Sequence, residues 1–153
     1  MRKRTKRKVY ALVNPIEHAI IGAAFPLQSK LDELRMLELT CIERFCNGRA
    51  TLKDWQSMSS LLAISEVMAK RGVGKDEVLP VCTIVENELI EAAHRFEATG
   101  RMVLTEAGLQ ALRDLYEYHD LQRNSVTQRE YEQMILATYN RIKSQAPDVK
   151  IIK

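Results

Sequence analysis

The sequence predicts an all-α protein, a helical bundle of about six helices with four main antiparallel helices and a basic N-terminal arm. Leu, Ala, Glu, Arg and Met are abundant, whereas the 153 residues include only 6 Gly and 4 Pro, a composition typical of helices rather than of sandwiches or barrels. Apolar residues recur at steps of three and four along most of the chain, which is the period of helices that bury one face. Capping residues precede these stretches and Gly follows several of them, so the helix ends are also marked.

One domain is expected from the length, which allows a core that is stable without disulfides or metal ions. The predicted organisation is a basic arm and joint over residues 1–13, a single helical domain over residues 14–146 and a C-terminal tail over residues 147–153. No run of about 18 apolar residues occurs, so no membrane span is expected.

The first two helices are predicted from their start and stop signals. Positions 14–17 read Asn-Pro-Ile-Glu, with Asn as the cap, Pro at the first helical position and Glu at the third. This start and the stop at Pro26 predict a helix from residue 15 to about residue 24. A second helix should begin after Ser29 and end at the Asn-Gly pair of positions 47–48, which favours a left-handed turn.

The third and fourth helices carry most of the predicted core. Thr51 and Asp54 should cap the third helix, which should end near residues 72–74. Its apolar residues cover more than one face, so we expect it to be the most buried helix, either central in the bundle or part of a homodimer face. The regular part of the fourth helix should begin at about Leu79, because Pro80 is tolerated only in a first turn, and it should end at Gly100.

Two further helices are predicted towards the C-terminus. The fifth should start at Thr105 and end at Asn124. Positions 127–130 read Thr-Gln-Arg-Glu, a full capping box that opens a sixth helix up to about Ser144. Long antiparallel neighbours with short links imply a helical bundle.

The charge is segregated along the chain. Of the 23 Lys and Arg side chains, six lie in the first ten residues, which leaves 17 against 20 Asp and Glu and a net charge of −3 in the remainder. Such a dense block of like charge usually marks a tail that binds a polyanion. Nucleic acid is the predicted partner, and the alternatives are an anionic membrane surface, an acidic protein face and the protein's own body. The predicted contacts are Arg2, Lys3, Arg4, Lys6, Arg7 and Lys8 to phosphates, with Tyr10 either stacking on a base or anchoring the arm.

An internal similarity adds two candidate loop contacts. Residues 43–49 (Glu-Arg-Phe-Cys-Asn-Gly-Arg) resemble residues 94–101 (His-Arg-Phe-Glu-Ala-Thr-Gly-Arg), since each is a helix end with Arg-Phe, then Gly-Arg, then a new helix. Either the chain contains a duplicated αα-hairpin that presents matched arginine loops, or Gly is the default helix terminator and the match is chance. Under the first interpretation, Arg49 and Arg101 are candidate contacts to a partner.

No catalytic or metal site is predicted. Cys41, Cys46 and Cys82 have neither a paired spacing nor a neighbouring His, so we expect small core residues rather than zinc ligands. Their odd number favours a reducing, cytoplasmic location. The chain has no Gly-x-Ser-x-Gly elbow and no Walker glycine loop. A non-enzymatic protein without a cofactor is therefore expected.

Metal-dependent HD phosphohydrolases are the alternative that the histidines raise, because those enzymes use imidazoles and carboxylates that converge on a metal ion. His119, however, falls on the apolar stripe of its helix, and the last carboxylate lies in the tail. We therefore expect His119 to pack at the core edge or to pair with a neighbouring carboxylate. The residues concerned are His94, His119, Asp120 and Asp148.

Four short stretches carry a resemblance: Met-Arg-Lys-Arg-Thr at positions 1–5, Asn-Pro-Ile at 14–16, His-Ala-Ile at 18–20 and Glu-Tyr-His-Asp-Leu-Gln-Arg at 117–123. Together they resemble a group of small uncharacterised helical proteins carried by phages and prophages of proteobacteria. The resemblance would cover most of the chain and implies a setting, the cytoplasm of a bacterial host. Small phage proteins there often block host complexes, including CRISPR effectors and other defence machines, or regulate phage genes. The resemblance transfers no catalytic residue.

Two functions remain open. The first is a non-enzymatic binding protein whose basic arm engages nucleic acid or a nucleoprotein complex. The second is a protein–protein inhibitor of a host complex, of anti-CRISPR or other anti-defence type, which acts through the slightly acidic helical body.

Overall fold

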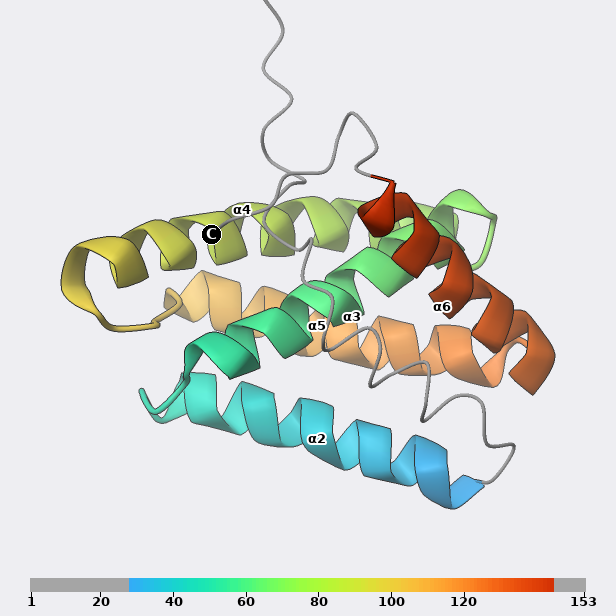
Figure 1. Ribbon diagram of the computed structural model, residues 1–153, viewed down its shortest axis with the longest axis horizontal. Coiled ribbons are helices and arrows are strands. Elements are labelled where there is room, and N and C mark those ends of the chain that lie inside the picture. The colour runs from blue at the N-terminus through green and yellow to red at the C-terminus, as the bar shows by residue number, and fades with distance from the viewer. Residues whose placement is uncertain (1–27, 145–153) are drawn as a thin grey trace, which may run out of the picture.

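The computed structural model describes residues 28–144, which form five α-helices and no strand. The all-α class is therefore confirmed for this part of the chain. The arm and the helix predicted over residues 15–24 lie outside the described residues, so the count of six helices stays a prediction. Figure 1 shows that α2 to α5 reverse direction one after another. The helices are α2 (Gln28–Cys46), α3 (Leu52–Lys70), α4 (Lys75–Thr99), α5 (Glu106–Asn124) and α6 (Gln128–Lys143).

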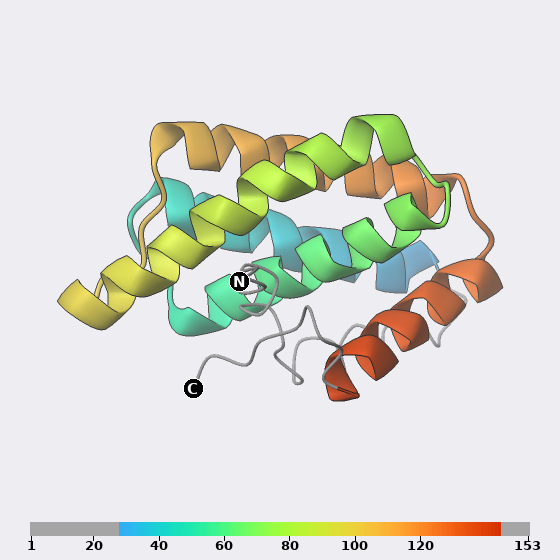
Figure 2. The same ribbon diagram turned by 90° about the horizontal axis from the view of Figure 1, so that it is seen from above.

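Helix α3 lies at the centre of the bundle. It packs against α2, α4, α5 and α6, and α5 also packs against α2 and α4. Figure 2 shows α6 beside the C-terminal half of α3, where Ile64 and Met68 of α3 form a small cluster with Tyr131 and Ile135 of α6. Fourteen of the 19 residues of α3 are buried, against seven in each of α4 and α5. The prediction that the third helix is the most buried is confirmed, and its position in the bundle accounts for its apolar coverage.

A hydrogen bond across the core fixes α3 against α4. Trp55, the only Trp of the chain, is 1% exposed, and its Nε1 donates to the carbonyl oxygen of Leu89 at 2.8 Å. A buried indole N–H needs such a partner, because leaving it unpaired would cost the hydrogen bonds it makes with water. The bond therefore lets the largest side chain of the core lie between the two helices.

The predicted helix starts agree with the structure at three places. Thr51 and Thr127 each form a complete capping box, and Thr105 caps α5 by accepting from the backbone N–H of Gly108. Helix α2 is already helical at Gln28, the first described residue, so its predicted start after Ser29 is wrong. Local capping chemistry thus marked the starts of α3, α5 and α6, but not those of α2 and α4.

The predicted start of α4 at Leu79 is wrong. The helix begins at Lys75, and the backbone N–H of Val78 closes its first turn on the carbonyl of Gly74 at 2.9 Å. Pro80 consequently lies in the second turn, where it removes one backbone donor and is exposed. Val78 is 2% exposed in the core, so the packing gained by the earlier turn outweighs the cost of the proline.

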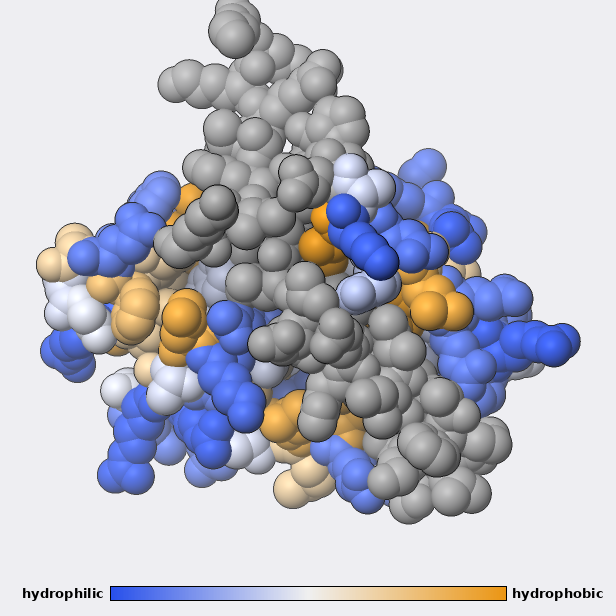
Figure 3. Space-filling model, viewed as in Figure 1, coloured by the Kyte–Doolittle hydropathy of each residue, from blue (hydrophilic) through white to orange (hydrophobic). Residues whose placement is uncertain are grey.

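The surface of the described part is mixed in character. Figure 3 shows hydrophilic side chains over much of this face and apolar ones exposed in separate places, including the left end of the molecule. The largest exposed fractions among apolar side chains are 65% for Leu121 and 62% for Met36. None of the described helices combines the length and the apolar character that crossing a bilayer requires.

Candidate functional site

The predicted polyanion contacts fall into two groups. Arg2, Lys3, Arg4, Lys6, Arg7, Lys8 and Tyr10 lie outside the described residues, and their contacts stay a prediction. Arg49 and Arg101 are described and exposed, in the α2–α3 and α4–α5 connections. Figures 1 and 2 both show these connections at the same end of the bundle. The structure therefore brings together the two loops that the sequence similarity paired.

The two loops are built alike. Gly48 and Gly100 adopt left-handed backbone conformations, with φ of 69° and 75°, which a side chain would strain. In each loop the arginine follows directly after this glycine. A Thr then caps the next helix, with Thr51 accepting from the Asp54 N–H and Thr105 from the Gly108 N–H. Each loop is thus a tight reversal closed at both ends by backbone hydrogen bonds.

The first arginine of each motif makes a hydrogen bond within the bundle. Arg44 donates from Nη1 to Oδ1 of Asp54 at 2.9 Å, and Arg95 donates from Nη2 to the carbonyl oxygen of Val103 at 2.9 Å. Burial alone would raise the pKa of Asp54, but the Thr51 backbone N–H and the Arg44 guanidinium lower it below its usual value. Arg44 therefore joins the end of α2 to the start of α3, and Arg95 joins α4 to the α4–α5 connection.

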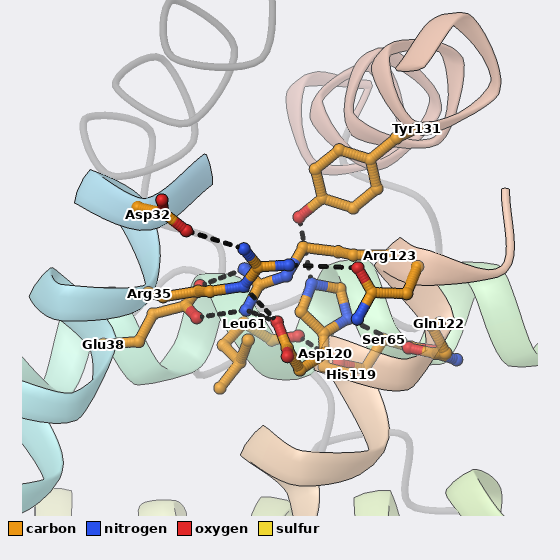
Figure 4. A network of polar contacts seen from close by, with 11 residues as sticks. Asp32, Arg35, Glu38, Leu61, Ser65, His119, Asp120, Gln122, Arg123 and Tyr131 are labelled. Carbon is orange, nitrogen blue, oxygen red and sulfur yellow. Dashed lines mark hydrogen bonds and ion pairs between the residues drawn. The ribbon is translucent and has the colours of Figure 1, made fainter. Parts of the chain in front are cut away.

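A second concentration of polar groups lies at the opposite end, inside the bundle (Figure 4). Arg123 of α5 donates to Glu38 of α2 through Nη1 to Oε2 at 2.9 Å and through Nη2 to Oε1 at 2.8 Å. The two side chains are only 1% and 8% exposed. Burial opposes the charge of Arg123, but the Glu38 carboxylate raises its pKa, so the guanidinium stays charged. Burial also raises the pKa of Glu38, and the guanidinium opposes that rise.

Arg35 of α2 extends this ion pair towards the surface. Its Nε donates to Oδ1 of Asp120 at 2.6 Å, and the same oxygen accepts from Arg123 Nη2 at 3.1 Å. Burial alone would raise the pKa of Asp120, but the Arg35 hydrogen bond and the charge of Arg123 lower it below its usual value. Arg35 also donates to Asp32 at 2.9 Å and to Asn124 at 3.0 Å. One carboxylate therefore lies between two guanidiniums and links α2 to α5.

Hydrogen bonds of His119 and of Gln122 link α5 to α3 and α6. Gln122 Nε2 donates to the carbonyl oxygens of Ser65 and Val73 at 3.2 and 2.9 Å. These acceptors orient the amide, so its Oε1 accepts from His119 Nδ1 at 2.9 Å. Nε2 of His119 then accepts from the Tyr131 hydroxyl at 3.0 Å. Burial, assisted by the charge of Arg123, lowers the pKa of His119 to about 3, so the imidazole is neutral.

The geometry of His119 corrects its predicted place at the core edge, because the side chain is fully buried. Its partners are an amide and a phenol rather than a carboxylate, while its neighbour Asp120 binds Arg35. His94 is exposed on α4, and Asp148 lies outside the described residues. Among residues 28–144, no three His, Cys, Asp or Glu side chains form a group that could hold a metal ion. The arrangement around His119 is that of a helix-joining polar cluster.

A cavity of about 190 Å³ lies beside this cluster, between the start of α2, the α5–α6 turn and the start of α6. Arg123 lines it, and the Nε of that side chain is buried without a hydrogen-bond partner. The adjacent charges are three carboxylates, Asp32, Glu38 and Asp120, against two guanidiniums. Among the described residues that line the cavity, Arg123 alone is charged, and the carboxylates of Glu38 and Asp120 already bind its guanidinium.

The three cysteines differ in their exposure to solvent. Cys41 and Cys82 are buried, as predicted, and burial raises the pKa of Cys41 to about 12. The prediction for Cys46 is wrong, since it is exposed at the last position of α2. Its Sγ accepts from Arg113 Nη2 at 2.9 Å. The helix turns Cys46 towards the flank that faces α5, away from the stripe that Cys41 and Phe45 bury.

Glu38 and Arg123 are not among the residues that the sequence predicted for a site. A signal was present, because each charged residue interrupts the apolar stripe of its helix, Glu38 between Leu34 and Cys41 and Arg123 four residues after His119. Such interruptions indicate a buried polar group that needs a partner. The sequence alone does not say that these two residues are partners.

Comparisons of the chain with protein-family models, with curated proteins and with solved structures gave no match. The resemblance to phage and prophage proteins therefore stays a prediction.

Proposed function

We propose that the chain is a small non-enzymatic binding protein of phage type, whose basic N-terminal arm engages nucleic acid or a nucleoprotein complex in the bacterial cytoplasm. The observation that carries the proposal is the segregation of charge. Six of the 23 basic side chains lie in residues 1–10 and two in the tail, which leaves 15 for residues 28–144. The same range holds 18 of the 20 acidic side chains, so the described body is slightly acidic while the arm is strongly basic.

The pairing inside the body supports this division of roles. Two buried carboxylates of the body are paired with cations of other helices, Glu38 with Arg123 and Glu66 with Arg141. These ion pairs join helices. A polyanion that approaches the protein would therefore be attracted chiefly by the arm and by exposed cations near the helix ends.

Phosphate binding by the arm has a defined physical signature. Each cation that neutralises a phosphate releases a counterion, so affinity falls with salt by a slope of about 0.9 per contact on duplex DNA and about 0.7 on single strands. Such contacts are indifferent to base sequence. The proposal thus predicts binding that depends strongly on salt and weakly on sequence.

A variant whose arm carries no basic side chains tests the proposal. In one variant the six cations of residues 2–8 are replaced by Gln, and a matched variant carries six Lys in their place. Binding of a labelled DNA duplex and of the matching single strand is followed by fluorescence anisotropy. The Lys variant should bind as the parent does, and the Gln variant should lose most of its affinity. Equal binding by the Gln variant and the parent would refute the proposal.

The second function, a protein–protein inhibitor of anti-defence type, is favoured by a different observation. Helix α2 exposes three large apolar side chains within four residues, Met36 at 62%, Leu37 at 39% and Leu39 at 43%. Apolar side chains grouped in this way are suited to contact with another protein. In a nuclease-treated bacterial lysate, this function predicts a captured partner that is lost on Met36→Gln with Leu39→Gln. A partner retained by that variant, or released by nuclease, argues against it.

A further inference from the structure

We infer that the loop end of the bundle, residues 47–51 and 100–105, is a second contact for nucleic-acid phosphates, made by Arg49 and Arg101. The inference rests on the proposed function, since it assumes that the chain binds nucleic acid. It adds a place on the folded body where the same polyanion is held.

The inference is supported by the different surroundings of the two arginines in each motif. Arg44 and Arg95 are used inside the fold, on Asp54 and on the carbonyl oxygen of Val103. The second arginine of each motif, Arg49 or Arg101, is exposed, and within residues 28–144 neither guanidinium has a hydrogen-bond or ion-pair partner. In both loops an exposed arginine that makes no side-chain hydrogen bond or ion pair with residues 28–144 directly follows a left-handed glycine, and such an arginine is available to a ligand.

The position of the two loops makes a joint contact feasible. The α2–α3 and α4–α5 connections lie side by side in both views (Figures 1 and 2). Residues of both loops also pack against one apolar cluster, with Ala50 from the first and Met102 and Leu104 from the second. The hydrogen bond from Arg113 near the start of α5 to Cys46 at the end of α2 joins the hairpins there. A single nucleic-acid strand can therefore reach both loops at once.

The chemistry of the two side chains fits phosphate. A guanidinium presents a planar set of donors that can bind two phosphate oxygens at once, which a single ammonium group does less well. The left-handed glycines and the Thr caps fix the backbone on both sides of each arginine. Less backbone entropy is then lost on binding than in an unstructured segment.

The surrounding charges limit the contact to these side chains. Asp54 is already paired with Arg44, and the exposed Lys53 adds one cation at the start of α3. Glu43, Glu97 and Glu106 are exposed close to the loops, so this end is not uniformly positive. Two placed guanidiniums, rather than a broad positive field, would therefore hold the phosphates.

The test compares charge-matched variants of the full chain. Arg49→Gln with Arg101→Gln removes the loop cations, and the control Arg71→Gln with Lys75→Gln removes two exposed cations at the other end of the bundle. Anisotropy titrations with a short DNA duplex and its single strand, at several salt concentrations, give the salt slope of each protein. Circular dichroism confirms that all variants are folded. The loop variant should lower the slope by about two contacts and the control by much less.

The outcomes separate the inference from the proposed function. If the loop variant and the control have equal slopes while a chain without residues 1–8 loses affinity, the loop contact is refuted and the arm stands. If deletion of residues 1–8 changes nothing but the loop variant binds less well than its control, the arm is refuted and the loop contact stands. If the parent chain binds neither the duplex nor the single strand, both are refuted.

Discussion

Arg123 and Glu38 lie 85 residues apart in the sequence and form a bidentate ion pair inside the bundle, with N–O distances of 2.9 and 2.8 Å. The pair joins the last turn of α5 to the middle of α2, and Asp120 links it to Arg35. Taking a charged group out of water is costly, so removal of either side chain would leave an uncompensated charge in the bundle. It therefore fixes how α2 and α5 meet.

The ion pair predicts a large cost for removing one partner. Arg123→Met leaves Glu38 buried without its counter-charge and should lower the free energy of unfolding by about 3–5 kcal/mol. The double variant Arg123→Met with Glu38→Met removes both charges and should be more stable than the single variant. Urea unfolding of the three proteins measures this. A double variant less stable than Arg123→Met would contradict the account.

His119 predicts a loss of stability in mild acid. Its ordinary pKa is 6.5 and burial lowers the folded value to about 3, so below pH 6.5 the unfolded state takes up a proton that the folded state does not. His119 alone should lower the free energy of unfolding by about 1.4 kcal/mol for each unit that the pH drops between roughly 6 and 4.5, and Glu38, whose pKa burial raises, offsets part of this loss. Asp54 and Asp120, whose pKa values are lowered, add their own loss only below about 4.

Unfolding in urea at a series of pH values tests the role of His119. His119→Gln should remove most of the slope in this window, although the variant will be less stable than the parent at neutral pH. His94→Gln is the matched control, because His94 is exposed on α4, and it should leave the slope in place. If the free energy of unfolding of His119→Gln still falls with decreasing pH as it does in the parent, other groups cause the acid sensitivity.

Pro80 predicts a gain of stability on replacement. It lies in the second turn of α4, where it lacks a backbone donor, and its side chain is exposed. Pro80→Ala restores one backbone hydrogen bond at no cost in packing and should raise the free energy of unfolding by about 1–3 kcal/mol. The gain is reduced by the freedom that the unfolded chain recovers. An unchanged or lower thermal midpoint would show that the proline is accommodated without strain.

Much of this fold could be predicted from local chemistry. Thr51, Thr105 and Thr127 mark helix starts because a cap is read from residues within one turn. The apolar coverage of α3 predicts its burial for a similar reason, since a helix with apolar residues on more than one face has to be surrounded. The start of α4 could not be read in this way. There, the burial of Val78 overrides the rule that places Pro80 in a first turn.

The candidate contacts could be predicted only in part. The motif similarity places Arg49 and Arg101 in matching loops, but it does not distinguish them from Arg44 and Arg95, whose partners are known only from the folded structure. Contacts between distant segments, such as Arg123 with Glu38, depend on how helices pack rather than on local spacing. The exposure of Cys46 could not be predicted for the same reason, because it depends on how α2 and α5 pack.

The salt dependence of DNA binding, measured for the full chain and for a chain without residues 1–8, tests the central claim most directly. The full chain should show a steep slope of log affinity against log salt. The truncated chain should keep its helical circular dichroism spectrum but bind more weakly, with a slope lower by about one unit for each lost phosphate contact. Equal affinity and equal slope in the two proteins would contradict the claim that the basic arm engages nucleic acid.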